Sequence, residues 1–262
     1  MSESPSYHAR RLMLALDAGR CVAADVSLAI ELAALIGAEL QGLFVEDSDL
    51  LQLAQLPFAR EVGERSGQDR PIVRASVESL LKRRIERVVS ELERAGKQRN
   101  VPVSHRTARG KVVRQALEQG ESGDVVLLRP PGASARVESR RLARALPGTV
   151  MVWYEDGPAF AASLDIALHL ARRLSAGLLV GFPAGRFESE ADVRAQLAAP
   201  LAGAPVPVRL RGIADATVGS VIEAARAARA LQLVISGHGT LATIEMLERI
   251  LDELASGLIV VR

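Results

Sequence analysis

Short apolar runs alternate along the whole chain with stretches of helical period, and this alternation restricts the fold more than any other feature. It is typical of βα units around a parallel sheet. The expected strands are Arg11–Asp17, Glu39–Val45, Val101–Thr107, Asp124–Arg129, Thr149–Tyr154, Gly177–Phe182, Val206–Arg211, Leu231–Ser236 and Gly257–Val261. The expected helices are Ala23–Ile36, Ser76–Lys97, Val112–Gln119, Val137–Leu146, Ala159–Leu174, Glu188–Leu201, Val218–Ala230 and Thr243–Ala255.

The pattern occurs twice. The run that ends in Asp17 matches the run that ends in Asp156, and residues 30–38 match residues 168–176. Self-similarity of this kind indicates a duplicated architecture. We therefore predict two tandem α/β units, the first over residues 9–147 with an insertion at 48–75 and the second, shorter one over residues 148–262.

The strand Thr149–Tyr154 fills two positions at once, because it suits both the fifth strand of the first unit and the first strand of the second. If it belongs to the second unit, the first unit lacks its own fifth strand and the strand Asp124–Arg129 has an open edge. Open edges are usually covered or paired. We expect either the strand Gly257–Val261 or a partner subunit to cover this one.

Asp17 closes the first strand and the sequence Gly-Leu-Phe-Val-Glu-Asp occupies residues 42–47, and in these features the chain resembles the universal stress protein family. The resemblance covers nearly the whole chain as a tandem pair. It implies flavodoxin-like (Rossmann-like) parallel sheets with strand order 3-2-1-4-5 and an association into dimers or pseudo-dimers. It also implies either an adenine-nucleotide site for ATP or AMP or, in a second branch of the family, no nucleotide site.

The nucleotide-binding branch has an Asp at the end of strand one, a backbone segment at the end of strand two, and Gly-x-x-Gly-x9-Gly-Ser/Thr after strand four. Asp17, Asp156 and Val45 match the first two features. In the third, glycines let backbone amides approach phosphate at a helix N-terminus.

That glycine loop is incomplete in both units. Pro130 and Pro131 remove amide donors in the first. In the second, no further Gly-Ser follows Gly239, and Glu245 and Glu248 add negative charge to the next helix. Tight triphosphate binding is therefore disfavoured.

Ligands of open parallel sheets bind beyond the carboxyl ends of the strands. In the second unit a small anion or a nucleotide base would meet Asp156, Gly212, Gly237, His238, Gly239 and Thr240. The alternative, which we favour, is a tight turn with Thr240 or Thr243 as a helix N-cap. In the first unit the same edge carries Asp17, Val45, Arg109, Gly110 and Arg129. There Arg109 and Arg129 would clamp an anion, or one of them would pair with Asp17, and both alternatives stay open.

No catalytic set emerges from the sequence. His238 lacks both an orienting acid and a nucleophile. The other histidines lack metal-ligand spacing, so no metal is expected. Cys21 is either a reactive thiol or, more often in such positions, a small packed residue. We therefore predict that the protein is not an enzyme and requires no cofactor.

The insertion contains an apolar stretch where loops are normally polar. Such a stretch either packs as ordinary core or forms a lid or an interface with a protein partner. The interface candidates are Leu50, Leu51, Leu53, Leu56 and Phe58.

Composition narrows the remaining possibilities. There are 33 Lys+Arg against 31 Asp+Glu, and 1 Trp, 2 Tyr and 5 Phe, which argues against a nucleic-acid partner. No apolar run reaches the ~20 residues of a transmembrane helix. A lone Cys favours the reducing cytoplasm.

We predict a non-catalytic regulatory or interaction module of the stress response, present as a homodimer paired through sheet edges. The alternative is a sensor of an adenine nucleotide or another anion, with weak hydrolysis.

Overall fold

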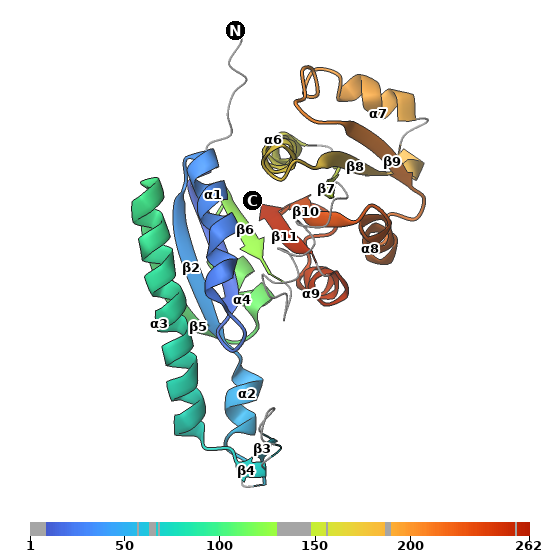
Figure 1. Ribbon diagram of the computed structural model, residues 1–262. Helices are drawn as coiled ribbons and strands as arrows, with labels where there is room; N and C mark the ends of the chain where they lie inside the picture. The colour runs from blue at the N-terminus through green and yellow to red at the C-terminus, as the bar shows by residue number, and fades with distance from the viewer. Residues whose placement is uncertain are drawn as a thin grey trace.

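The computed structural model describes residues 9–56, 58–62, 67, 69–129, 148–155, 157–186, 190–254 and 256–262. A 9-stranded sheet runs through the molecule, with helices on both of its faces (Figure 1). Its strands are β1 (Arg11–Asp17), β2 (Glu39–Glu46), β5 (Val103–Arg109), β6 (Asp124–Leu128), β7 (Thr149–Trp153), β8 (Gly177–Pro183), β9 (Val208–Ile213), β10 (Ala230–Ser236) and β11 (Gly257–Val261). The predicted strands are thus present within two residues at each end.

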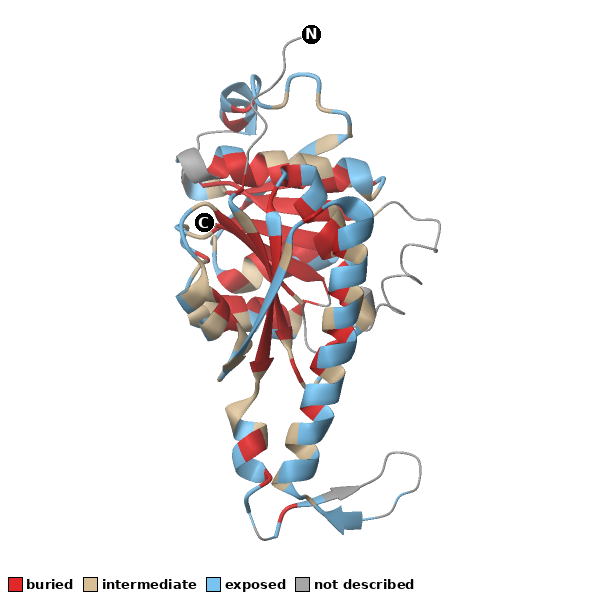
Figure 2. Cartoon of the chain, turned by 90° about the vertical axis from the view of Figure 1, so that its left-hand side faces the viewer, coloured by how far each residue is buried: buried red, intermediate tan, exposed pale blue. Residues whose placement is uncertain are grey.

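Helices pack on each face of the sheet because alternate strand residues point to opposite sides. Leu12 and Leu14 belong to one apolar cluster, whereas Met13 and Ala15 belong to the other. The first cluster is covered by α1 (Val26–Ile36), α3 (Arg74–Arg99), α6 (Pro158–Arg173) and α7 (Glu190–Gln196), and the second by α4 (Val112–Gln119), α8 (Val218–Ala227) and α9 (Ile244–Glu253). Short 3-10 turns lie at η1 (Ala23–Asp25) and η2 (Ala184–Arg186). Figure 2 shows the buried residues gathered in the sheet and on the helix sides that face it.

The order of the strands is β5-β2-β1-β6-β11-β10-β7-β8-β9. Read from the β9 end, the second half has the predicted 3-2-1-4-5 order, and the first half has 3-2-1-4. The strand β7 pairs in parallel with β8 and β10, so it lies within the second half. The predicted α/β fold class is confirmed, and among the described residues the place of a fifth strand beside β6 is taken by β11.

The open edge of β6 is covered from within the chain. The strand β11 pairs with β6 in the antiparallel sense, with Val126 opposite Val260, while its other edge pairs in parallel with β10. Of the two expected covers, the structure therefore shows the strand Gly257–Val261. A second chain is not needed at this edge. The two predicted sheets are joined into one, and β5 and β9 form its outer edges.

The insertion is folded rather than irregular. It contains α2 (Ser48–Leu53) and an antiparallel hairpin of β3 (Arg60–Val62) and β4 (Asp69–Pro71), which is separate from the main sheet. We call α2 and this hairpin the arm; it extends beyond the carboxyl end of β2 beside the start of α3 (Figures 1 and 2).

Two expectations are not tested by the described residues. The predicted helix Val137–Leu146 lies outside the described residues, and the division at residue 147 stays a prediction. Among the residues described, no helix combines the length and the apolar character that crossing a bilayer requires.

The pairing of β11 with two strands generates a testable prediction. Replacing the fully buried Ile259 by Ala should lower the free energy of unfolding by about 2–5 kcal/mol. Both halves should still unfold in one transition, because they share the sheet. The emission of Trp153 in β7 and the far-ultraviolet circular dichroism of the whole chain should give the same urea midpoint.

Leu35→Ala in the exposed part of α1 is the control and should cost less than about 1 kcal/mol. Two separate transitions in the Ile259→Ala variant, one seen by Trp153 and one by dichroism alone, would contradict a single cooperative sheet.

Candidate functional site at the carboxyl edge of the sheet

At the ends of β1 and β2, Asp17 and Val45 lie opposite each other in the paired register. The carboxylate of Asp17 accepts a hydrogen bond from the backbone N–H of Gly19 at 2.7 Å, and Arg20 lies 3.8 Å from its other oxygen. The carbonyl of Val45 accepts from the N–H of Ala18 at 2.9 Å. Both predicted residues therefore hold the turn that follows β1.

The two predicted arginines of the first half lie in separate ion pairs. The Arg109 Nε donates to Glu46 at 3.0 Å, and the N–H of Gly110 donates to the Glu46 carbonyl, also at 3.0 Å. Arg129 lies 3.4 Å from Asp25, and both side chains are only 6% exposed. The structure does not bring the arginines together as a clamp, and neither pairs with Asp17.

In the second half, the turn after β10 encloses a carboxylate that sequence reasoning missed. Glu155 follows β7 and is only 8% exposed. Its Oε1 accepts hydrogen bonds from the backbone N–H and from the hydroxyl of Thr240, both at 2.6 Å. Its Oε2 is buried without a hydrogen-bond partner among the described residues. A Cβ at Gly239 would lie 1.5 Å from this oxygen, so a side chain there would displace the carboxylate of Glu155.

The register of the paired strands identifies Glu155 as the counterpart of Asp17. Leu12 pairs with Leu40 in the first half, and Val150 pairs with Leu178 in the second. Asp17 and Glu155 each lie five residues beyond those pairing positions. The match of run endings pointed to Asp156 instead, which lies outside the described residues.

The other predicted residues of the second half have different environments. The N–H of Gly237 donates to the Val261 carbonyl at 2.6 Å, which extends the β10–β11 pairing. His238 is exposed, and its backbone N–H donates to the Ser236 hydroxyl at 3.3 Å. Gly212 lies within β9 against Phe182, not in this turn. The N-cap of α9 is Thr243, one of the two expected.

Carboxylates thus face several of the donors described at this edge. The internal pairs are Gly19–Asp17, Arg109–Glu46, Arg129–Asp25, Lys111–Asp49 and Thr240–Glu155. Because charge-assisted hydrogen bonds are the strong ones, an incoming phosphate must displace a carboxylate already in place. The described residues contain no group of three His, Cys, Asp or Glu side chains that could hold a metal ion.

The base of the arm is fixed to this edge. Asp47 caps α2 by accepting from the N–H of Asp49 at 2.9 Å, and Lys111 lies 2.6 Å from Asp49. The hydrogen bond to Asp49 raises the pKa of Lys111. Of the interface candidates, Leu51 is buried and Leu50 is half-buried, whereas Leu53, Leu56 and Phe58 are exposed. The stretch therefore packs at its start and is open to solvent at its end.

Cys21 is a packed residue. It is buried beside the turn after Asp17, its Sγ lies 3.6 Å from the Ala18 carbonyl, and burial raises the pKa of its thiol to about 11. The folded state therefore favours the neutral thiol, which is a poor nucleophile at neutral pH.

This shift predicts how stability depends on pH. Because the pKa of Cys21 is higher in the folded state, its contribution is complete below the ordinary thiol pKa and is lost as pH rises towards about 11. Relative to Cys21→Ala, the wild type should lose roughly 2 kcal/mol of unfolding free energy between pH ~9 and ~11. Urea titrations of both proteins would measure this, and parallel curves would contradict it.

No family model matches the chain, and no curated protein matches it. Solved structures do match. A universal stress protein from Archaeoglobus fulgidus DSM 4304 has a TM-score of 0.54 at 12% identity, and the match covers 98% of this chain and 97% of that one. A protein from Pseudomonas aeruginosa UCBPP-PA14, provisionally assigned as a universal stress protein, has a TM-score of 0.50 at 13% identity and coverages of 98% and 95%.

A further universal stress protein, solved in complex with cAMP, has a TM-score of 0.35 at 16% identity. The match covers 44% of this chain and 97% of that one, and it is too remote for the ligand to be carried over. At such identities the likeness concerns the fold. The chain has the α/β fold of the universal stress protein structures.

Proposed function

We propose that the chain is a degenerate tandem universal stress protein that acts as a non-catalytic regulatory or interaction module in a stress response. Its two units would be residues 9–147 and 148–262. The proposal places the protein in the cytoplasm, which the lone reduced Cys21 supports. The exposed apolar end of the arm carries the proposal.

The exposed apolar side chains at that end of the arm and at the adjoining start of α3 form a surface that we call the apolar tip. It consists of Leu53, Leu56, Phe58 and Val73. Phe58 is 75% exposed, and the other three side chains are also exposed. The N–H of Ile72 donates to the Ala59 carbonyl at 3.1 Å, which holds Val73 near Phe58. Fully burying one large apolar side chain is worth about 1.5–3 kcal/mol. A partner that covers the apolar tip would therefore gain several such contributions.

The attachment of the arm supports a binding role. Lys111 joins α2 to the start of α4, and Leu51 is buried at the base. A preorganised surface loses less conformational entropy when it binds a partner. The described base of the arm is therefore attached to the start of α4, which lowers the entropy that α2 would lose on binding a partner.

The hydrogen bonds of Glu155 support a role that does not involve nucleotide binding. Its carboxylate already accepts the N–H and hydroxyl of Thr240, donors that a phosphate would otherwise receive in this turn. Glu245 in the first turn of α9 adds a second negative charge nearby. Electrostatics at this helix start therefore disfavour a triphosphate.

The second candidate function is a sensor of an adenine nucleotide such as ATP or AMP, or of another anion, with weak hydrolysis. One observation favours it, namely the buried Oε2 of Glu155, which lacks a hydrogen-bond partner among the described residues. Burying a carboxylate oxygen without a donor is costly. The exocyclic amine of adenine is a donor of the required kind.

Calorimetry with ATP and AMP separates the two functions. We expect no saturable binding by the wild type up to about 1 mM ligand. Glu155→Ala should free the donors of Thr240 and bind ATP with a dissociation constant at least about tenfold below this limit of about 1 mM. Glu245→Ala removes a nearby charge without touching Thr240 and should gain less.

Saturable binding of ATP by the wild type, weakened in Glu155→Gln, would contradict the non-nucleotide role and establish the sensor.

The apolar tip generates a separate prediction. The variant Leu53→Gln/Leu56→Gln/Phe58→Gln should keep its circular dichroism and stability, because these side chains are exposed. Crosslinking and affinity capture from stressed cells should recover a set of proteins with the wild type and lose it with this variant. Leu35→Gln, which alters an exposed leucine on α1, is the matched control and should retain the set.

Sedimentation of the same proteins tests the proposed homodimer. A dimer that persists in the triple variant would be held through the outer strands β5 or β9. Recovery of identical proteins by the wild type and the triple variant would contradict the role of the apolar tip.

A further inference from the structure

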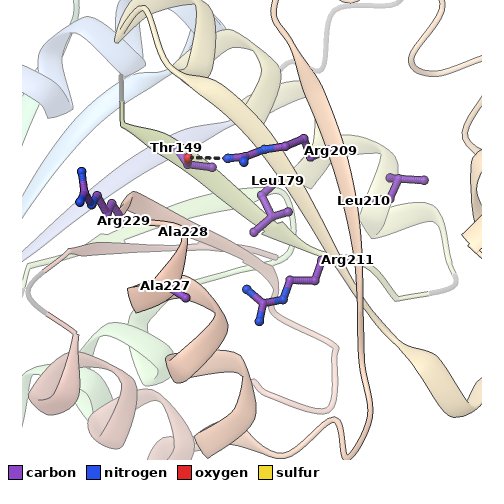
Figure 3. A pocket seen from close by; sticks show the side chains of 8 residues that line it. All are labelled: Thr149, Leu179, Arg209, Leu210, Arg211, Ala227, Ala228 and Arg229. Carbon is purple, nitrogen blue, oxygen red and sulfur yellow. Dashed lines mark hydrogen bonds between the residues drawn. The ribbon is translucent and has the colours of Figure 1, made fainter. Parts of the chain in front are cut away.

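A pocket of about 410 Å³ lies at the end of the sheet opposite to the turn that holds Glu155. Thr149 opens β7, Arg229 directly precedes β10, and Arg209 is near the start of β9. Figure 3 shows the side chains of Arg209 and Arg211 extending from β9, with Arg229 across the pocket from them. The floor is formed in part by Leu179 of β8.

The pocket exists because α8 ends before it covers the outer strand. Arg209 and Arg211 alternate along β9 and therefore project from the same face of the sheet. The last turn of α8 brings only the small side chains of Ala227 and Ala228 to this region. The chain then turns into β10 through Arg229, which has a φ of 53°. A non-glycine residue in this left-handed region is uncommon.

Three arginines, Arg209, Arg211 and Arg229, line this pocket, and none of them has an acidic partner among the described residues. The Arg209 Nη2 donates to the Thr149 hydroxyl at 3.4 Å, which is a neutral partner. By contrast, the neighbouring Arg226 in α8 lies 3.6 Å from Glu253 of α9, which neutralises its charge. The pocket therefore concentrates positive charge that the described protein does not neutralise.

We infer that this pocket binds a small phosphate-bearing molecule, with Arg209, Arg211 and Arg229 as its charged ligands. Guanidinium groups offer paired N–H donors that match two oxygens of one phosphate. Three cations balance the charge of a diphosphate better than that of a single carboxylate. The volume lies within the roughly 300–1,000 Å³ of small-molecule pockets, and Leu179 provides apolar contact for an attached organic group.

The site is independent of the carboxyl edge. The pocket lies by the amino ends of β7 and β10, whereas Glu155 and Thr240 follow the carboxyl ends of the same strands. Binding here therefore does not require the donors that Glu155 occupies. Failure of this inference would leave the proposed function intact.

The test is calorimetry of the full chain with inorganic pyrophosphate at constant ionic strength. We expect one site per chain with a dissociation constant on the order of 10–100 μM, and at least tenfold weaker binding in Arg211→Gln and in Arg229→Gln. Arg106→Gln is the matched control, because Arg106 is an exposed arginine on the opposite outer strand β5. Its affinity should equal that of the wild type.

Thermal unfolding of each variant with and without pyrophosphate gives a second measurement, because a ligand of the folded state raises the midpoint. The midpoint should rise in the wild type and in Arg106→Gln, and not in Arg211→Gln or Arg229→Gln. Three results would overturn the inference. These are the absence of saturable binding, an equal loss of affinity in Arg106→Gln, and citrate binding as tightly as pyrophosphate.

Discussion

The antiparallel pairing of β11 with β6 is the interaction on which the rest of the structure depends. A chain with two similar halves and 9 strands in its main sheet leaves one half without a fifth strand. The last strand of the second half satisfies the backbone groups of β6 and also pairs with β10. One continuous sheet results, with apolar clusters on both faces. Because this edge is closed internally, association with other molecules is left to the surfaces beyond it.

The two ends of the sheet differ in whether their positively charged and donor groups have acidic partners. At the carboxyl edge several described cations and amides face the protein's own carboxylates, as with Arg129 and Asp25 or Thr240 and Glu155. At the opposite end Arg209, Arg211 and Arg229 have no acidic partner among the described residues. An anion at the carboxyl edge would have to compete with the protein's own carboxylates. An anion at the arginine pocket would meet positive charge that no described carboxylate neutralises. We therefore propose that partner proteins bind at the arm and that small phosphate-bearing molecules bind at the amino ends of the strands, away from the carboxyl edge.

The sequence predicts the inner strands well because they are short apolar runs that are buried in the sheet, and β1 and β11 have the predicted limits. The outer strands β5 and β9 are largely exposed, and each lies two residues later than predicted. The cover of β6 follows from counting strands, since an open edge is costly. The ion pairs do not follow from the sequence. Arg129 pairs with Asp25, which is distant along the chain, and Glu155 was passed over for its neighbour Asp156. Side-chain partners depend on the exact packing of loops, which periodicity does not encode. The arginine pocket likewise arises from where α8 ends.

We propose that internal carboxylates occupy the donors at the carboxyl edge and that the protein therefore holds no nucleotide there. The most direct measurement is mass spectrometry, together with ultraviolet absorbance, of whatever small molecule is released when gently purified protein is denatured. The account predicts no adenine nucleotide in stoichiometric amount. Release of ATP or AMP at close to one equivalent per chain would contradict it.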